Sequence, residues 1–349
     1  MFRRLEWEAV DEAAGQPILA IDLGGTQIRA AHVSPDRRIA CRRAVPTEDR
    51  EGVDSVVARL CELARSVRAD AREQQLPDPV GIGISSPGPL DPWRGVVVAP
   101  PNLAGWRDVP LVERVERELH LPTFLERDTN VAVMAEWRFG SAVGTRCAIY
   151  ITVSTGIGGG IIIDARPLIG LDGTAGEVGH MTVDLEGPLC GDGMPGHVEA
   201  IGSGTAIARE GRALLDRGGS SVLAELAGSA EVDAALVARA ADQGDAACTE
   251  ILERAYEAVG AMCASLVNAL NPEVIVLGGS IADKRPRLHI VARAEVDHRA
   301  FPAPAARVRI EPARFGDDVS LIGSLPIVNE RLRDPAYGQR RSLSEGASR

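Results

Sequence analysis

Two short segments far apart in the chain each combine an apolar run with a glycine turn and hydroxyl side chains. The first runs from Ile18 to Thr26 and the second from Ala148 to Gly160. A second apolar run follows each turn at once, which predicts a β-hairpin and excludes the strand, loop and helix of a P-loop. Backbone N–H groups and the hydroxyls of Thr26, Ser154 and Thr155 could bind a polyphosphate there. Either hairpin alone would suit an ordinary glycine turn, but the pair, with the acidic Asp22 at the end of the first strand, favours a nucleotide.

Asp128 lies where a predicted strand gives way to a predicted helix, beside the amides of Thr129 and Asn130. An aspartate at this position can cap the helix. It can also accept the proton of a substrate hydroxyl that attacks a phosphoryl group, if it comes within hydrogen-bonding distance. The residues alone leave both roles open.

A glycine-rich stretch holds four side chains that could bind Zn²⁺ tetrahedrally, because zinc accepts imidazole, thiolate and carboxylate ligands. Two further carboxylates flank them, and such a concentration of acceptors suits a polyhydroxyl ligand such as a sugar. A solvated acidic loop with a stray cysteine is the alternative. The four candidate ligands are His180, Cys190, Asp192 and His197, and the flanking carboxylates are Glu177 and Glu199.

Length and composition indicate two globular domains. The chain has 349 residues, 45% of them hydrophobic and 25% charged, with 37 glycines and 22 prolines, which is typical of a turn-rich α/β protein. The net charge of −11 does not favour binding to nucleic acid, which requires a basic surface. No apolar stretch approaches the ~20 residues of a membrane span, and the segment from Met1 to Glu8 turns acidic where a signal peptide would be apolar. We therefore expect a cytoplasmic protein with no membrane or nucleic-acid partner, and reduced thiols at its six scattered cysteines.

Hydrophobic periodicity predicts the elements that position these residues. A strand-hairpin-helix plan occurs twice, which predicts a duplicated α/β fold with ligands in the cleft between the halves. Besides the two hairpins, strands are expected at 80–86, 123–126 and 274–279. Helices are expected at 52–74, 109–120, 129–138, 204–217, 232–243, 245–270 and 317–332, the last with a break at Pro326.

In their order along the chain, these motifs resemble the ROK family of sugar kinases and sugar-responsive repressors, which has the actin-like ATPase (ribonuclease H-like) fold of two lobes. The resemblance covers about residues 17 to 330. It implies an N-terminal lobe at 17–128 and a C-terminal lobe at 129–316, with the sugar and zinc loop at 170–204. A C-terminal helix at 317–332 would return to the first lobe. A polar lead-in at 1–16 and a disordered tail at 333–349 would complete the chain.

The resemblance also assigns roles to single residues. Asp128 matches the family's catalytic base, and Asp22 would help to hold Mg²⁺. Contacts with ATP are implied for Asp22, Gly24, Gly25, Thr26, Thr155, Gly156, Gly158, Gly278 and Gly279. Contacts with the sugar are implied for Asn102 in its Pro-Asn-Leu-x-x-Trp motif, Arg127, Asp128, Glu177 and His180 in the Glu-x-Gly-His motif, and Glu199 near the anomeric hydroxyl.

Two departures from the family pattern affect these roles. Family kinases usually have Glu-Asn-Asp where this chain has Glu126-Arg127-Asp128, so an amide that binds the sugar is replaced by a longer cation. Arg127 could point into the sugar site or turn outward to pair with Glu126. The family's zinc loop usually offers three cysteines, of which this chain keeps Cys190, so the implied site has fewer soft ligands.

The expected activity is that of a hexokinase that transfers a phosphoryl group from Mg²⁺-ATP to the 6-hydroxyl of glucose. Another hexose or an N-acylhexosamine, such as fructose, mannose or N-acetylmannosamine, is the alternative substrate, and polyphosphate the alternative donor. A sugar-sensing repressor is disfavoured, because such relatives carry a winged-helix domain before the first hairpin and 17 residues precede Ile18 here. The intact hairpins and Asp128 disfavour a catalytically silent sugar-binding protein. The resemblance further implies a homodimer or homotetramer.

Overall fold

The computed structural model describes residues 15–334 and residue 337. The chain forms two compact units, and the described part of unit 1 comprises residues 15–131, 318–334 and 337, while unit 2 comprises Ala132–Asp317. The chain therefore passes from unit 1 to unit 2 within one helix, α3 (Asp128–Phe139), and returns before its last helix. The polar lead-in expected at 1–16 and the disordered tail expected at 333–349 lie almost wholly outside the described residues.

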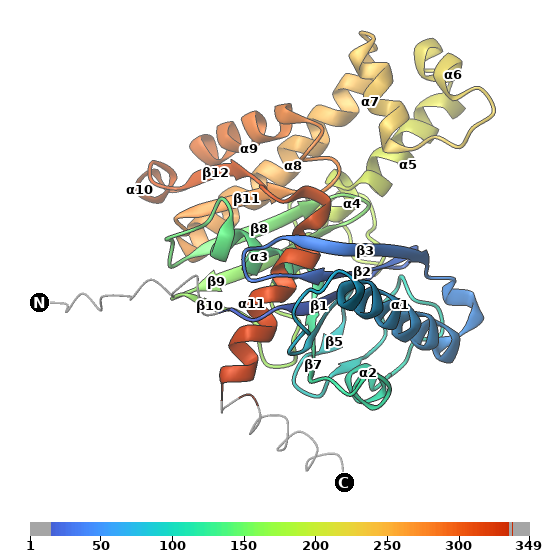
Figure 1. Ribbon diagram of the computed structural model, residues 1–349. Helices are drawn as coiled ribbons and strands as arrows, with labels where there is room; N and C mark the ends of the chain where they lie inside the picture. The colour runs from blue at the N-terminus through green and yellow to red at the C-terminus, as the bar shows by residue number, and fades with distance from the viewer. Residues whose placement is uncertain (1–14, 335–336, 338–349) are drawn as a thin grey trace, which may run out of the picture. The chain divides into compact units, whose positions relative to one another are not determined.

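Unit 1 is built on a five-stranded sheet in the order β3-β2-β1-β4-β7 (Figure 1). Strands β1, β2 and β3 are antiparallel neighbours, and β1, β4 and β7 run parallel. The strands are β1 (Ile18–Leu23), β2 (Gln27–Val33), β3 (Ile39–Pro46), β4 (Ile82–Ser86) and β7 (Thr123–Arg127), with a small hairpin of β5 (Leu90–Asp91) and β6 (Val96–Val97). The helices are α1 (Val53–Glu73), α2 (Leu111–Leu119) and α11 (Val319–Arg333), with a short 3-10 turn, η2 (Asp49–Glu51).

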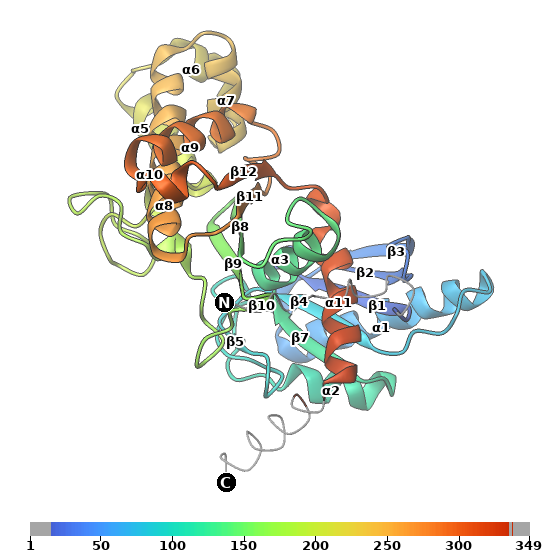
Figure 2. The same ribbon diagram turned by 90° about the vertical axis from the view of Figure 1, so that its left-hand side faces the viewer.

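Alternation along β4 explains why this sheet is covered on both faces. Ile82 and Ile84 belong to the apolar core that the sheet shares with α1 and α2. Gly83 points the other way, toward α11, where a Cβ atom would lie 2.8 Å from the Cβ of Ser324. Helix α11 therefore packs closely on β1 and β4, as both views show (Figures 1 and 2).

The break expected at Pro326 is wrong, because α11 continues through that residue. Proline in a helix removes one hydrogen bond and usually kinks or ends the helix. Here every residue from Ser320 to Asn329 is buried, so tertiary packing of this helix outweighs the local preference.

Unit 2 repeats the plan with a sheet in the order β10-β9-β8-β11-β12. Its strands are β8 (Ala148–Val153), β9 (Ile157–Ile163), β10 (Arg166–Pro167), β11 (Val274–Gly278) and β12 (Arg309–Pro312). Its helices are α4 (Glu199–Gly202), α5 (Gly204–Asp216), α6 (Ser221–Ala227), α7 (Ala234–Asp242), α8 (Ala246–Leu270), α9 (Pro286–Arg299) and α10 (Pro302–Ala305), with 3-10 turns η3 (Val178–His180) and η4 (Gly316–Asp318). The sequence did not predict α6, α9 or α10.

If the strands of each sheet are renumbered 1 to 5 along the chain, both sheets have the order 3-2-1-4-5. In both, strands 1 to 3 are antiparallel neighbours and strands 1, 4 and 5 run parallel. The prediction of a duplicated α/β, ribonuclease H-like fold is confirmed by this repeat. Within the described part of the chain, no helix combines the length and apolar character that a membrane crossing requires.

Candidate functional site

The first glycine turn joins β1 to β2 and is fastened by Thr47. The N–H of Gly24 donates to the carbonyl of Gln27 at 3.0 Å, and the Thr47 hydroxyl donates to the carbonyl of Gly24 at 2.6 Å. Asp22, one residue before the end of β1, pairs with its cross-strand neighbour Arg29, with 2.6 Å between Oδ2 and Nη2. The turn therefore leaves the Thr26 residue exposed and presents a carboxylate already paired with one cation.

The loop that carries Asn102 lies directly against this turn. A Cβ atom at Gly25 would lie 2.6 Å from the backbone oxygen of Asn102, so no larger residue fits there without moving the loop. The N–H of Ala104 donates to Asp49 Oδ2 at 3.0 Å, which ties the same loop to η2. The structure thus brings a predicted sugar-binding residue of unit 1 into contact with the predicted phosphate turn of the same unit.

Asp128 is the first residue of α3 and follows β7 without a linker. Its Oδ1 accepts the N–H of Thr129 at 2.7 Å, and the residue is half-buried. The capping contact that the sequence allowed is therefore present through one carboxylate oxygen.

Arg127 is buried, with 4% of its surface exposed. Its side chain lies against the loop after β4, where its Cδ would be 3.2 Å from a Cβ atom at Gly88. Glu126 pairs instead with Arg331, through the guanidinium of that residue. The alternative in which Arg127 turns outward to pair with Glu126 at the surface is therefore wrong.

The second glycine turn, between β8 and β9, is fastened by the glutamate predicted to bind the sugar. Oε2 of Glu199 accepts the N–H of Ile157 at 2.8 Å, and a Cβ atom at Gly156 would lie 2.6 Å from that same oxygen. Sequence reasoning missed this bond, because it joins residues 42 positions apart.

The segment with Gly278 and Gly279, which is predicted to contact ATP, also lies beside the second turn. The hydroxyls of Ser154 and Ser280 are 2.9 Å apart, and the N–H of Ile281 donates to the carbonyl of Val153 at 3.0 Å. Gly279 has a φ of +93°, and a Cβ atom there would lie 2.6 Å from the Thr152 hydroxyl. Glycine is thus required where β11 ends against β8.

The four candidate metal ligands converge. Nδ1 of His180 and Nδ1 of His197 are 3.3 Å apart, and Asp192 Oδ2 lies 3.1 Å and 3.3 Å from them. Cys190 Sγ lies 4.0 Å from His180 Nδ1, and one ligand atom from each of the four residues lies within 4.8 Å of the others. Zinc bonds of about 2.0–2.3 Å at tetrahedral angles separate ligand atoms by roughly 3.3–3.8 Å. The atoms of His180, Asp192 and His197 lie at the lower end of that range or just below it.

Local hydrogen bonds and burial shift the pKa of two groups in this cluster. The N–H of Met194 donates to Asp192, which with the two nearby histidines holds the pKa of that carboxyl below its usual range. Burial raises the pKa of the Cys190 thiol. Glu199 stands next to the cluster, with Oε1 4.0 Å from Cys190 Sγ.

The Glu-x-Gly-His motif forms the turn η3 against the start of β9. A Cβ atom at Gly179 would lie 2.1 Å from the carbonyl oxygen of Ile157, so this glycine allows the turn to approach the strand. Glu177 and His180 on either side of it are exposed. Glu199 and the turn η3 therefore both contact Ile157, the residue that follows the second glycine turn.

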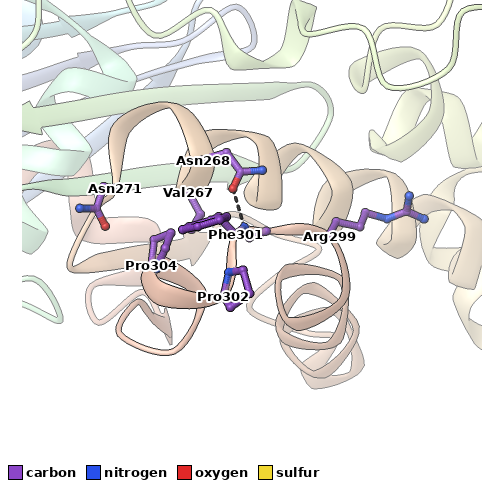
Figure 3. A pocket seen from close by; sticks show the side chains of 8 residues that line it. Val267, Asn268, Asn271, Arg299, Phe301, Pro302 and Pro304 are labelled. Carbon is purple, nitrogen blue, oxygen red and sulfur yellow. Dashed lines mark hydrogen bonds between the residues drawn. The ribbon is translucent and has the colours of Figure 1, made fainter.

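A surface hollow elsewhere in unit 2 contains none of the predicted site residues (Figure 3). It lies beside the end of α8, where Asn268 Oδ1 accepts the N–H of Phe301 at 2.7 Å. Its lining is Val267, Asn268, Asn271, Arg299, Ala300, Phe301, Pro302 and Pro304.

Known proteins are similar to this chain over most of its length. The ROK family model matches residues 18–331. A glucokinase of Thermotoga maritima is 32% identical over 316 residues, which are 90% of this chain and 98% of that protein. An N-acetylmannosamine kinase of Citrobacter koseri is 32% identical over 307 residues, which are 88% of this chain and 96% of that protein.

A crystal structure of a ROK family glucokinase from Streptomyces griseus, in complex with glucose and AMPPNP, superposes with a TM-score of 0.75. It is 28% identical, and the superposition covers 89% of this chain and 98% of that one. These likenesses confirm the predicted actin-like ATPase fold and the prediction of a sugar kinase. The chain belongs to the ROK family.

Proposed function

We propose that this sugar kinase is an ATP-dependent hexokinase that phosphorylates glucose at its 6-hydroxyl. The observation that carries the proposal is the position of Asp128, a half-buried carboxylate at the junction of β7 and α3 with one oxygen bonded to the Thr129 amide. The likeness to the Thermotoga glucokinase, over nearly its whole length, supports glucose as the substrate.

In the proposed reaction, Asp128 accepts the proton of the 6-hydroxyl while that oxygen attacks the γ-phosphorus of ATP. The new bond joins the sugar oxygen to phosphorus, and the bond between phosphorus and the β,γ-bridging oxygen breaks. ADP leaves with the bridging oxygen, and the proton stays on Asp128 until solvent removes it. The backbone N–H groups and hydroxyls of the two glycine turns would hold the phosphates.

Asp22 fits a role in holding Mg²⁺, because Mg²⁺ prefers carboxylate oxygens. The ion neutralises charge that develops on the transferred phosphoryl group. The pairing of Asp22 with Arg29 also fits, since a fixed cation orients the carboxylate before the metal-nucleotide arrives.

The donors of His180, Cys190, Asp192 and His197 fit a structural zinc. Zinc at this position would fix the loop that ends at Glu199, the residue that bonds the second glycine turn. One thiolate in place of the family's three makes a harder ligand set, which lowers the preference for zinc without removing it.

An N-acetylmannosamine kinase is the second candidate, because the Citrobacter enzyme is as similar in identity as the glucokinase. Arg127 is the residue expected to affect the preference among sugars, since its buried guanidinium can donate to ring hydroxyls but cannot accept from them. Arg127→Asn should change relative kcat/KM among glucose, mannose and glucosamine by about tenfold or more, the scale of one or two altered hydrogen bonds. Unchanged ratios would remove Arg127 from the sugar site.

A coupled ADP-release assay over hexoses, hexosamines and N-acetylhexosamines tests the activity, with polyphosphate as a competing donor. Asp128→Asn tests the base, because asparagine also caps helices but accepts no proton. We expect a folded variant whose kcat is lower by about two orders of magnitude or more. Near-wild-type turnover of that folded variant would contradict the assignment.

A further inference from the structure

A buried ion pair lies next to the junction of β7 and α3, where Asp128 is located, and the proposed reaction does not use it. Glu126 is 2% exposed and pairs through Oε2 with the guanidinium of Arg331, which comes from the last turn of α11. Arg331 also donates from Nη1 to the carbonyl of Leu125 at 2.8 Å. The residues of this pair lie 205 positions apart, so the end of α11 holds the end of β7 through two separate bonds.

The other oxygen of Glu126 holds the two sides of the junction. Oε1 accepts the backbone N–H of Arg127 and the side-chain amide of Asn130, both at 2.9 Å. These two donors come immediately before Asp128 and from the first turn of the helix that Asp128 begins. The Glu126 carboxylate therefore holds the backbone just before the proposed base and the Asn130 side chain just after it.

Aromatic rings enclose the cation of this pair. The Arg331 guanidinium lies 5.0 Å from the ring centre of Tyr337 and 5.8 Å from that of Trp93, within range of a cation–π interaction. Tyr337 packs on Phe124 with ring centres 5.4 Å apart, and its hydroxyl donates to the carbonyl of Pro92 at 3.1 Å. Tyr337 lies beyond residue 331, where the match to the family model ends.

We propose that Arg331 is a positioning residue for the phosphoryl-transfer step, which acts on Asp128 through Glu126. The inference rests on the proposed role of Asp128 as the base. A carboxylate with 2% exposure cannot keep its charge cheaply once its cation is removed, because a lone buried charge is strongly unfavourable. Without Arg331, Glu126 must move toward water or take up a proton, and either change alters its hold on the Asp128 junction.

The test compares Arg331→Met, Arg331→Lys and the double variant Arg331→Met with Glu126→Gln. In Arg331→Met we expect kcat to fall by about 10- to 100-fold, since a small displacement of a catalytic group has effects of that size. KM for glucose and for ATP should change by less than about threefold. The position of Asp128 affects proton transfer in the transition state more than it affects the binding of either substrate. The double variant should be at least about threefold faster than Arg331→Met, because a neutral amide can stay buried and still accept from Arg127 and Asn130.

Arg333→Met is the matched control, since Arg333 is exposed in the same turn of α11, and it should keep kcat within about twofold. Thermal unfolding of every variant separates positioning from stability. A kcat of Arg331→Met within threefold of wild type, a parallel rise in both KM values, or a double variant no faster than the single one would overturn the proposal. Arg331→Lys keeps the charge and should lose less kcat than Arg331→Met. Should Arg331→Met not fold, Arg331→Gln decides, because glutamine removes the charge but can still donate to the Leu125 carbonyl, and a wild-type kcat would overturn the proposal.

Asp128→Asn, measured beside these variants, separates two kinds of failure. If Asp128→Asn retains turnover, the proposed base is wrong. If Asp128→Asn loses turnover while Arg331→Met retains it, the base stands and the positioning role of Arg331 is wrong.

Discussion

The glycine turns of the two units contact the predicted sugar-binding residue of their own unit by different means. In unit 1, a Cβ atom at Gly25 would lie 2.6 Å from the backbone oxygen of Asn102, and in unit 2 a Cβ atom at Gly156 would lie 2.6 Å from the carboxylate of Glu199. A backbone oxygen moves only with its loop, whereas the end of a glutamate side chain can rotate. The duplicated fold thus keeps a contact between each glycine turn and a predicted sugar-binding residue, while the chemical groups that form the contact differ.

Charge distinguishes the same two turns. Asp22 faces Arg29 across the first hairpin, and the equivalent pair in the second hairpin is Thr152 and Gly158. A carboxylate is thus placed next to the turn in unit 1 and a hydroxyl in unit 2. The comparison predicts that a metal-bound phosphate depends on unit 1 and that unit 2 contributes neutral donors.

The largest effect is expected when the charge of Asp22 is removed. Asp22→Asn should lower kcat/KM for Mg²⁺-ATP by about 100-fold, because a hard oxygen ligand of the metal is lost. Thr152→Val, at the equivalent place in unit 2, should cost less than about tenfold, the scale of one neutral hydrogen bond. Steady-state kinetics at varied Mg²⁺ measure both, and equal losses would refute the assignment of charge to one unit.

A smaller effect is expected from Gly25→Ala. The new methyl group must displace the backbone at Asn102, and overpacking of this kind costs about 1–3 kcal/mol. We expect kcat/KM for glucose to fall by roughly 30-fold, with a lower Tm, and the two quantities can be measured on one preparation. If the variant behaves as wild type, the Asn102 loop is not held by the turn.

Metal removal should affect the glucose site by a lesser amount. Among residues 15–334 and 337, His180, Cys190, Asp192 and His197 are the set that could hold a metal ion. We expect about one zinc per chain by elemental analysis, and a rise in KM for glucose of about tenfold after chelation, with a smaller change in KM for ATP. Well under one zinc per chain, with full activity after the chelator has been dialysed away and Mg²⁺ restored, would decide against the site.

The smallest effect is expected from Gly156→Ala. Its methyl group would push the Glu199 carboxylate away from the Ile157 amide, at a cost of about one hydrogen bond, or ~1 kcal/mol. Catalytic efficiency should fall by about fivefold, less than for Gly25→Ala. A larger loss for Gly156→Ala than for Gly25→Ala would show that the backbone at Asn102 yields more easily than the Glu199 side chain.

Sequence reasoning succeeded where neighbours in the chain make the feature. The hairpins, the position of Asp128 after a strand, and the convergence of the four candidate ligands between His180 and His197 all depend on short-range spacing. The predictions failed where a feature depends on residues that are far apart in the chain. The pairing of Glu126 with Arg331 and the unbroken α11 depend on tertiary packing that no local pattern encodes.

Arg127 illustrates the limit for the site itself. Its type and position raised the question of where the side chain points, but the answer depends on the approach of Gly88 from a separate strand end. Helix α9 was missed for a related reason, since only Leu288, Val291, Ala292 and Val296 are buried among its fourteen residues. Burial of so few positions leaves a weak pattern in the sequence.

The placement of α11 has a consequence for biosynthesis. Unit 2 is one continuous stretch, whereas the sheet of unit 1 is covered on one face by a helix that follows unit 2 in the chain. A ribosome therefore releases every residue of unit 2 before it supplies the helix that unit 1 still lacks. Until then the strands beside Gly83 keep an apolar face open to water, a state that favours chaperone binding and aggregation. A nascent chain that stops before residue 319 would hold a complete second unit and an unfinished first one.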